Sequence, residues 1–234
     1  MSGHESSDPT RRVQIPVAMD AGDPNNPAEA LSLEGECVVP AGAVGIVLFA
    51  HGSGSSRHSP RNQFVAQAIR EAGIATVLFD LLTAGEEAAE RASGHLRFNI
   101  CLLTRRLVDA TRWVARRPDT QRMGIGYFGA STGAAAALAA AADIGPAIDA
   151  VVCRGGRPDL AGDALEQVQS PTLLIVGERD QEVLDLNRSA AARLHCEKEI
   201  RIVPRATHLF EEPGALEEVA RLASDWFRSR LRPR

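Results

Sequence analysis

The stretch Met123–Gly133, which reads Met-Gly-Ile-Gly-Tyr-Phe-Gly-Ala-Ser-Thr-Gly, decides the fold class. A short apolar run, Ile125–Phe128, leads into the turn, and an alanine-rich segment, Ala134–Ala142, follows it. This order predicts a strand, a tight turn and a helix, with Ser131 at the apex of the turn. The pattern matches the G-x-S-x-G nucleophile elbow, in which a strained turn presents a serine at the end of a strand.

Two glycines support this interpretation. An elbow brings strand and helix very close together, so a Cβ at Gly129 or Gly133 would collide with its neighbours. The helix that follows also directs the positive end of its dipole at Ser131. The motif is short, however, and alone it could arise by chance.

A dinucleotide-binding fingerprint is the main alternative for this stretch. Gly124–Gly129 also spells G-x-G-x-x-G, and Asp149 lies 20 residues beyond. Such a fingerprint follows a strand, whereas the preceding Arg116–Arg122 is charged and contains Pro118. The glycines therefore lie inside the only strand that the sequence allows, which disfavours dinucleotide binding.

The composition indicates one α/β domain. The chain has 234 residues, of which 44% are hydrophobic and 24% charged, as in ordinary globular proteins. Residues 1–11 are polar and predict a disordered tail, and residues 12–234 a single domain. The formal net charge is −4, so no nucleic-acid partner is expected.

The cysteines and the N-terminus indicate the compartment. The four cysteines lie far apart without a C-x-x-C pair, which is typical of buried thiols in a reducing compartment and predicts neither a metal site nor disulfides. Met1–Arg12 lacks the apolar core of a signal peptide, and no apolar run reaches 18 residues. We expect a soluble cytoplasmic protein with no membrane partner and no cofactor.

The remaining segments alternate between strand and helix patterns. Arg12–Ala18 and Leu31–Pro40 alternate polar and apolar residues, with a loop at Asp20–Pro27 between them, and predict an antiparallel hairpin. Further strands are predicted at Val44–Phe49, Ile74–Phe79, Ala147–Cys153, Thr172–Val176 and Glu199–Val203. Helices are predicted at Pro60–Ala72, His95–Arg117, Asp159–Val168, Glu182–Leu194 and Gly214–Arg230, with a loop and a short helix in Leu81–Gly94. This is a mostly parallel, doubly wound sheet with no large cap domain, whose function sits at the carboxyl ends of its strands.

A serine nucleophile needs a base and a group that orients the base. Among the six histidines, His208 alone follows the last strand, in a loop. His51 also follows a strand, but it belongs to a glycine-rich loop and is expected to brace that loop. Asp180 follows the preceding strand and is the expected orienting acid, with Glu178 as the main alternative and Glu182 as another. The order Ser, Asp, His is the one that α/β-hydrolases use.

The tetrahedral intermediate of acyl transfer needs two hydrogen-bond donors for its oxyanion. The backbone N–H of Thr132, directly after the serine, is the first candidate. The N–H of Ser53 is the expected second donor, and Gly54 the reserve, because glycines allow this loop to turn its amides inward.

Arg154 is a candidate substrate-binding residue. It ends a predicted strand at the catalytic edge, where its guanidinium could bind a substrate carboxylate in fork geometry. An ion pair with a nearby acid is an equal alternative. The cluster Arg57–Arg61 could also attract an anion, although a solvated start of a helix is the expected explanation.

With these residues in place, the chain from Arg12 to Leu231 resembles α/β-hydrolases of the small dienelactone hydrolase-like group. The resemblance is carried by His51–Gly54, Gly129–Gly133, Gly177–Asp180 and Ala206–His208. It implies that Ser131 attacks an acyl carbonyl, His208 relays the proton and Asp180 holds His208 in the required tautomer. Dienelactone hydrolase has a cysteine nucleophile, and the serine found here favours general ester chemistry. The chain also resembles hydrolase domains that some bacteria fuse to a phosphoribosyltransferase domain, of which the sequence shows no sign.

We therefore expect a metal-independent serine hydrolase that cleaves carboxylic ester bonds of small substrates. A thioesterase, a lactonase or an acyltransferase would use the same residues, and a non-catalytic binding module is the alternative of another class. The low aromatic content of 4% and the absence of a cap predict an open site for small acyl groups. The sequence leaves open whether the protein is a monomer or a homodimer.

Overall fold

The computed structural model describes residues 10–17 and 31–234. The loop predicted at Asp20–Pro27 and residues 1–9 of the predicted tail lie outside this range. Arg11 is already part of the first strand, where it pairs with Cys37.

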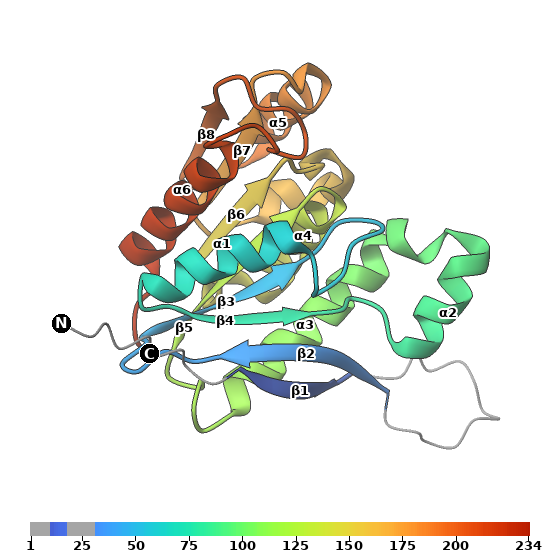
Figure 1. Ribbon diagram of the computed structural model, residues 1–234, viewed down its shortest axis with the longest axis vertical. Helices are drawn as coiled ribbons and strands as arrows, with labels where there is room; N and C mark the ends of the chain where they lie inside the picture. Colours follow the sequence, from blue (N-terminus) through green and yellow to red (C-terminus); the bar gives the residue numbers. More distant parts are fainter. Residues whose placement is uncertain (1–9, 18–30) are drawn as a thin grey trace.

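An eight-stranded sheet forms the centre of the described structure (Figure 1). Its strands lie in the order β1-β2-β4-β3-β5-β6-β7-β8. Their bounds are β1 Arg11–Pro16, β2 Ser32–Val38, β3 Gly45–Ala50, β4 Ala75–Phe79, β5 Gly124–Ala130, β6 Ala150–Arg154, β7 Thr172–Gly177 and β8 Lys198–Val203. β2 pairs antiparallel with both β1 and β4, and the other pairs are parallel. The predicted hairpin on a mostly parallel sheet is thus confirmed.

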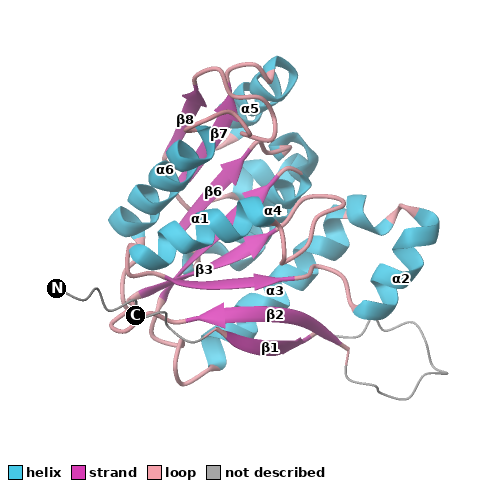
Figure 2. Ribbon diagram, viewed as in Figure 1, coloured by secondary structure: helices cyan, strands magenta, loops and turns pink. Residues whose placement is uncertain are grey.

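Helices cover both faces of the sheet (Figure 2). α1 (Pro60–Glu71) and α6 (Ala215–Arg230) pack on one face, and α3 (Ile100–Arg116), α4 (Thr132–Ile144) and α5 (Gln181–Arg193) on the other. Every residue of the central strands β3 to β7 is buried, which explains their continuous apolar runs. The domain is therefore doubly wound, as predicted.

The glycines of the possible dinucleotide fingerprint all lie within strand β5. A Cβ on Gly126 would come within 2.7 Å of the Phe227 ring, which lies against this strand. Gly126 thus lets α6 pack closely on the sheet, and the three glycines form no phosphate-binding turn.

The segment between β4 and α3 differs in part from its prediction. Instead of one helix from His95 to Arg117, a 3-10 turn, η1 (Leu96–Phe98), precedes α3. The side chain of Asn99 accepts a hydrogen bond from the N–H of Leu102 and so fixes the start of α3 one turn later. An asparagine inside an amphipathic pattern is the signal that marks this boundary.

The same segment contains α2 (Ala84–Ser93), the short helix expected there. A capping box between Thr83 and Glu86 starts it, and Gly94 ends it in a left-handed conformation. Between β6 and β7 the predicted helix is a 3-10 helix, η3 (Pro158–Gln167), which the backbone of Gly162 interrupts at φ 56°. Within the described residues, nothing larger than α2 and η1 stands over the carboxyl edge of the sheet near β4, so no large cap domain is present there.

Candidate active site

Ser131 occupies a strained turn between β5 and α4. Its backbone has φ 51° and ψ −123°, a conformation that non-glycine residues rarely adopt. The N–H of Ser131 donates to the carbonyl of Arg154 over 3.2 Å, and its carbonyl accepts from Arg157 over 3.0 Å. These two hydrogen bonds anchor the strained serine to the end of the neighbouring strand β6 and to the loop that follows it.

Close backbone contacts around Ser131 require the glycines of the elbow. A Cβ on Gly129 would lie 2.6 Å from the Cα of Ala134, and a Cβ on Gly133 would overlap the carbonyl of Ala50. Gly52 comes equally close from the loop after β3, because a Cβ there would be 2.9 Å from the Cβ of Ser131. The predicted collisions at Gly129 and Gly133 are confirmed, and they show how tightly elbow, helix and loop are packed.

Asp180 and His208 meet at the same edge of the sheet. Asp180 follows β7, His208 follows β8, and His208 Nδ1 lies 2.6 Å from Asp180 Oδ2. Glu178, the alternative acid, instead accepts a hydrogen bond from the backbone N–H of Arg205 over 2.7 Å. The side chain of Asp180 is 14% exposed and that of His208 is 40% exposed, so the imidazole is accessible while its carboxylate partner is sheltered.

The elbow and the histidine loop meet at Gly155, the residue after β6. A Cβ on Gly155 would be 3.6 Å from His208 Cε1 and 3.2 Å from the His208 carbonyl oxygen. The Ser131 hydroxyl makes no hydrogen bond to His208 in the described structure. In enzymes without bound substrate such hydrogen bonds are often long, and they shorten in the reactive complex.

The loop after β3 contacts the first residue of α4. The backbone N–H of Ser53 donates to Thr132 Oγ1 over 2.9 Å, and the two hydroxyl oxygens also lie 2.9 Å apart. Gly54, the reserve donor, has φ 69° and bends the loop directly after Ser53. From the sequence, the backbone N–H groups at these positions were expected as oxyanion donors. Nothing in the sequence indicated that the Thr132 hydroxyl accepts from Ser53, because spacing alone does not show where a side chain points.

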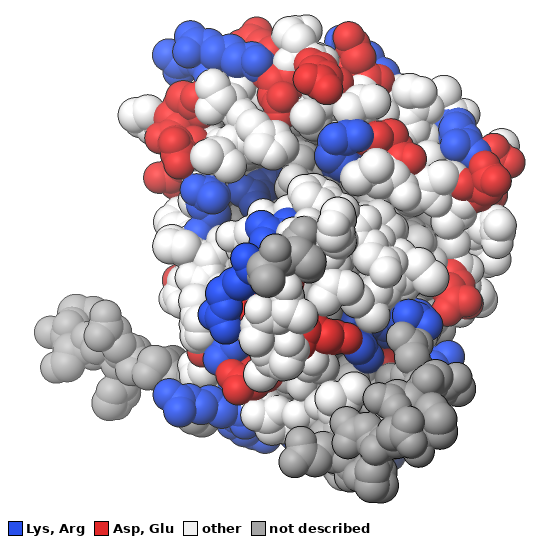
Figure 3. Space-filling view, turned by 90° about the vertical axis from the view of Figure 1, so that its right-hand side faces the viewer, with Lys and Arg blue, Asp and Glu red and all other residues white. Residues whose placement is uncertain are grey.

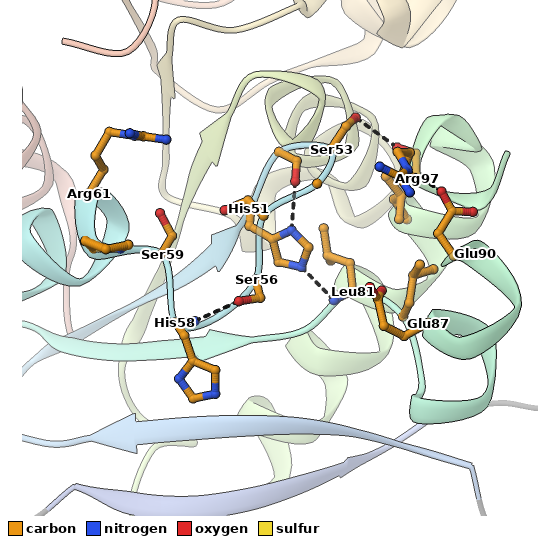
Figure 4. Close-up of a pocket in the computed structure, with 16 residues that line it drawn as sticks. His51, Ser53, Ser56, His58, Ser59, Arg61, Leu81, Glu87, Glu90 and Arg97 are labelled. Carbon is orange, nitrogen blue, oxygen red and sulfur yellow. Dashed lines mark hydrogen bonds and ion pairs between the residues drawn. The ribbon is translucent and has the colours of Figure 1, made fainter. Parts of the chain in front are cut away.

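His51 holds this loop in place through two hydrogen bonds. Its Nε2 accepts a hydrogen bond from the N–H of Leu81 over 3.1 Å, so the proton of the neutral ring must sit on Nδ1, which donates to the Gly52 carbonyl over 3.0 Å (Figure 4). Burial lowers the pKa of His51. The expected bracing role of His51 is confirmed, since the ring joins the loop after β3 to the end of β4.

A pH dependence follows from this neutral histidine. In the unfolded chain the His51 ring gains a proton below about pH 6.5, whereas the folded loop needs the ring neutral. The unfolded state therefore binds more protons than the folded state below that pH, and the contribution of His51 to stability is lost as the pH falls further. We expect the free energy of unfolding to fall between pH 7 and pH 5 in the wild type, and to fall less steeply in His51→Gln. Urea denaturation at pH 5, 6, 7 and 8 measures both slopes. Equal slopes in the two proteins would contradict this explanation.

A cavity of about 570 Å³ opens beside the glycine-rich loop (Figure 4). Gly52 and Ser53 form part of its wall and place it next to Ser131. Ser59 and Arg61, from the start of α1, line one side of it in the close-up. The opposite side is formed by residues of α2 and η1, namely Glu87, Glu90 and Arg97.

Arg154 lies at the carboxyl end of β6, as predicted, but no acidic side chain of the described residues pairs with it. It is 8% exposed and forms no ion pair with any carboxylate in the part of the chain that the structure describes. Its Nη2 donates to Asn62 Oδ1 over 3.4 Å, and its guanidinium carbon is 5.9 Å from the centre of the Phe210 ring. Arg57, by contrast, pairs with Asp80 and Glu34.

Across residues 10–17 and 31–234, no helix is both long and apolar enough to cross a membrane. In the same part of the chain, no three His, Cys, Asp or Glu side chains form a group that could hold a metal ion.

Comparison with known proteins gives the family. The family model described as "Alpha/beta hydrolase domain" matches residues 43–219. A solved dienelactone hydrolase from Anabaena variabilis is 52% identical, with a TM-score of 0.90 over 96% of this chain and 99% of that one. The esterase Est1E from Butyrivibrio proteoclasticus shares the fold alone, at 14% identity and a TM-score of 0.71 over 86% of this chain and 96% of that one.

A curated relative carries a different name. A Mycobacterium tuberculosis protein named as a phosphoribosyl transferase is 58% identical over 200 residues, which are 86% of this chain and 44% of that protein. The chain thus spans less than half of that relative, and the name refers to the whole of it. The family match, the 52% identical structure and the observed sheet agree, and the chain belongs to the α/β-hydrolase family.

Proposed function

We propose that this protein is a serine hydrolase that cleaves carboxylic ester bonds through a covalent acyl-enzyme. The observation that carries the proposal is the arrangement at the carboxyl edge of the sheet. There a serine held at φ 51° lies beside the loop that carries His208, and Asp180, from the loop after β7, binds the Nδ1 of His208. A strained nucleophile and an oriented base are the two requirements for activating a hydroxyl group.

In the proposed reaction His208 removes the proton of Ser131 as the hydroxyl attacks the ester carbonyl. Because Nδ1 faces Asp180, the Nε2 atom is the one left to accept that proton. His208 then donates the proton to the leaving alcohol, and the acyl group remains on Ser131. A water molecule that His208 deprotonates hydrolyses this acyl-enzyme and restores the free serine.

The oxyanion of each tetrahedral intermediate would be stabilised by the backbone N–H groups of Thr132 and Ser53, with that of Gly54 in reserve. Thr132 begins α4, so its N–H belongs to the positive end of a helix dipole. The N–H of Ser53 is occupied by Thr132 Oγ1 in the described state. For this donor to act, the threonine hydroxyl must rotate away when the oxyanion forms.

The same site could process a thioester or a lactone, or transfer the acyl group to an alcohol, because these reactions share the acyl-enzyme. The low aromatic content and the single short helix α2 beside the cavity support small acyl groups. Four free cysteines, two of them buried, support a reducing, cytoplasmic location. We propose no metal or cofactor in this reaction.

A fluorophosphonate probe tests the proposal directly, since it reacts with activated serines. We expect one equivalent to label the wild-type protein at Ser131, as located by peptide mass spectrometry. The same protein should hydrolyse p-nitrophenyl acetate and butyrate with a chelator present, and labelling should abolish this activity. A protein that neither labels nor hydrolyses these esters would favour the non-catalytic binding module.

A further inference from the structure

The guanidinium of Arg154 is a buried positive charge without a counter-charge. Its Nε atom has no hydrogen-bond partner, and its Nη2 has only the long contact of 3.4 Å to the Asn62 amide oxygen. Burial, and next the charge of Arg61, lower the pKa of Arg154 to about 10, so the group still carries its charge at pH 7. A buried charge that lacks an ionic partner is destabilising, and a ligand of opposite charge would offset that cost.

A second arginine and a helix terminus add positive potential at the same place. Arg61, in the first turn of α1, has a buried Nε atom without a partner, and its Nη1 reaches only the exposed Glu211 over 3.3 Å. α1 has 12 residues and begins beside both arginines, so the positive end of its dipole adds to their field. Figure 3 views the molecule from the side on which the parallel strands end and shows basic and acidic side chains interspersed over that surface.

Arg154 adjoins both halves of the proposed catalytic centre. Its carbonyl accepts the N–H of Ser131, and the next residue, Gly155, lies against the His208 ring. Its guanidinium faces Phe210, two residues after His208. A substrate that places its ester at Ser131 and a second group at this guanidinium must therefore be short.

We propose that Arg154, with Arg61 beside it, binds the free carboxylate of a substrate that is a monoester of a short dicarboxylic acid. The inference rests on the proposed serine hydrolase function and adds the class of its substrate. A monoanion fits the charge balance, because Arg154 lacks a counter-charge whereas Arg61 already has Glu211. The planar guanidinium offers paired donors that match the two oxygens of a carboxylate.

The charges on the two sides of the cavity favour one orientation of a negatively charged substrate. Its far side carries Glu87, and Glu90, whose carboxylate is held by Arg97. The near side carries Arg61 and the start of α1. A negative group is therefore favoured at the α1 side, where Arg61 lines the cavity and Arg154 contacts Asn62 of α1, and disfavoured at the α2 side.

The test compares charged and uncharged esters of matched shape. We measure kcat/KM for the monoethyl and diethyl esters of succinic, glutaric and adipic acid by proton release. The wild type should prefer the monoester of one chain length, and Arg154→Met should lower the monoester-to-diester ratio by about 10- to 100-fold, as expected for lost hydrogen bonds to a charged group. Arg154→Lys should lower the monoester-to-diester ratio less than Arg154→Met does, since lysine keeps the positive charge but lacks the paired donors of the guanidinium. Arg188→Met, which removes an exposed arginine of α5, serves as the matched control.

A purely structural role of Arg154 predicts a different result. In that case Arg154→Met would lower the melting temperature and reduce the activity on both esters equally, with the ratio unchanged. That outcome, or a wild type without preference for any monoester, would overturn the inference.

A binding measurement separates this inference from the proposed reaction. Ser131→Ala should bind monoethyl glutarate more tightly than diethyl glutarate in calorimetry, and Ser131→Ala combined with Arg154→Met should lose this difference. If Ser131→Ala kept its esterase activity, the reaction would be wrong while the calorimetry still decided the role of Arg154. Equal binding of both esters by Ser131→Ala would contradict the carboxylate site even if the esterase activity were established.

Discussion

Replacing Ser131 by alanine is expected to lower kcat for p-nitrophenyl acetate by on the order of 10⁵- to 10⁶-fold, as loss of the nucleophile does in serine hydrolases. Without the hydroxyl no acyl-enzyme can form, and the oxyanion donors and His208 can assist only the direct attack of water. Alanine is as strained as serine at φ 51°, so the elbow and its hydrogen bonds to the end of β6 should be retained. The melting temperature should therefore change little.

Burst kinetics and steady-state rates measure this effect. The wild type should show a p-nitrophenol burst whenever deacylation is slower than acylation, and Ser131→Ala should show none. Ser189→Ala, which removes an exposed hydroxyl on α5, is the matched control and should keep the wild-type rate. Full activity in Ser131→Ala would refute the acyl-enzyme and leave the elbow as a structural feature.

The sequence was sufficient to predict the elbow because the chemistry of that turn restricts its residues. The packing distances at Gly129 and Gly133 leave no room for a side chain, so glycine is required and is visible in the sequence. The buried parallel strands were equally predictable, since strands covered on both faces show continuous apolar runs. Both predictions concern positions where one residue type, or one class of residues, is the only one that fits.

Boundaries and side-chain directions were less predictable. The single helix predicted at His95–Arg117 was wrong at its start, because the Asn99 cap competes with an amphipathic pattern that continues through it. The contact between Ser53 and the Thr132 hydroxyl joins residues 79 positions apart, and nothing local in the sequence encodes it. For the same reason the sequence left open whether Arg154 meets an acid, a question that only its surroundings in the fold decide.

The acid expected to orient His208 shows both what the sequence could predict and what it could not. Glu178, Asp180 and Glu182 all follow β7 closely, and the sequence favoured Asp180 by its place between strand and helix. In the structure Asp180 is the N-cap residue of α5 and its carboxylate faces His208, whereas Glu178 turns back to the N–H of Arg205. Position along the chain limited the choice to three acids, and side-chain direction distinguishes among them.

The second large effect is therefore expected at Asp180. In Asp180→Asn the side-chain amide can donate to Nδ1 of His208, which moves the ring proton to Nε2. In the proposed reaction the Nε2 atom accepts the proton of Ser131, but in this variant it would be a donor. The loss of the required tautomer is expected to lower kcat by about 10⁴-fold, the effect of this change in serine proteases.

Glu178→Gln is the matched control, because it makes the same chemical change in the competing acid two residues earlier. It should keep the wild-type kcat to within a few-fold, since Glu178 binds only the backbone N–H of Arg205. Steady-state rates on p-nitrophenyl acetate compare the two variants, with melting temperatures to verify that both are folded. A large loss in Glu178→Gln together with normal activity in Asp180→Asn would transfer the orienting role to Glu178. A similar small effect in both would mean that His208 acts without a carboxylate, and the exposed imidazole would then have to be oriented by its loop alone.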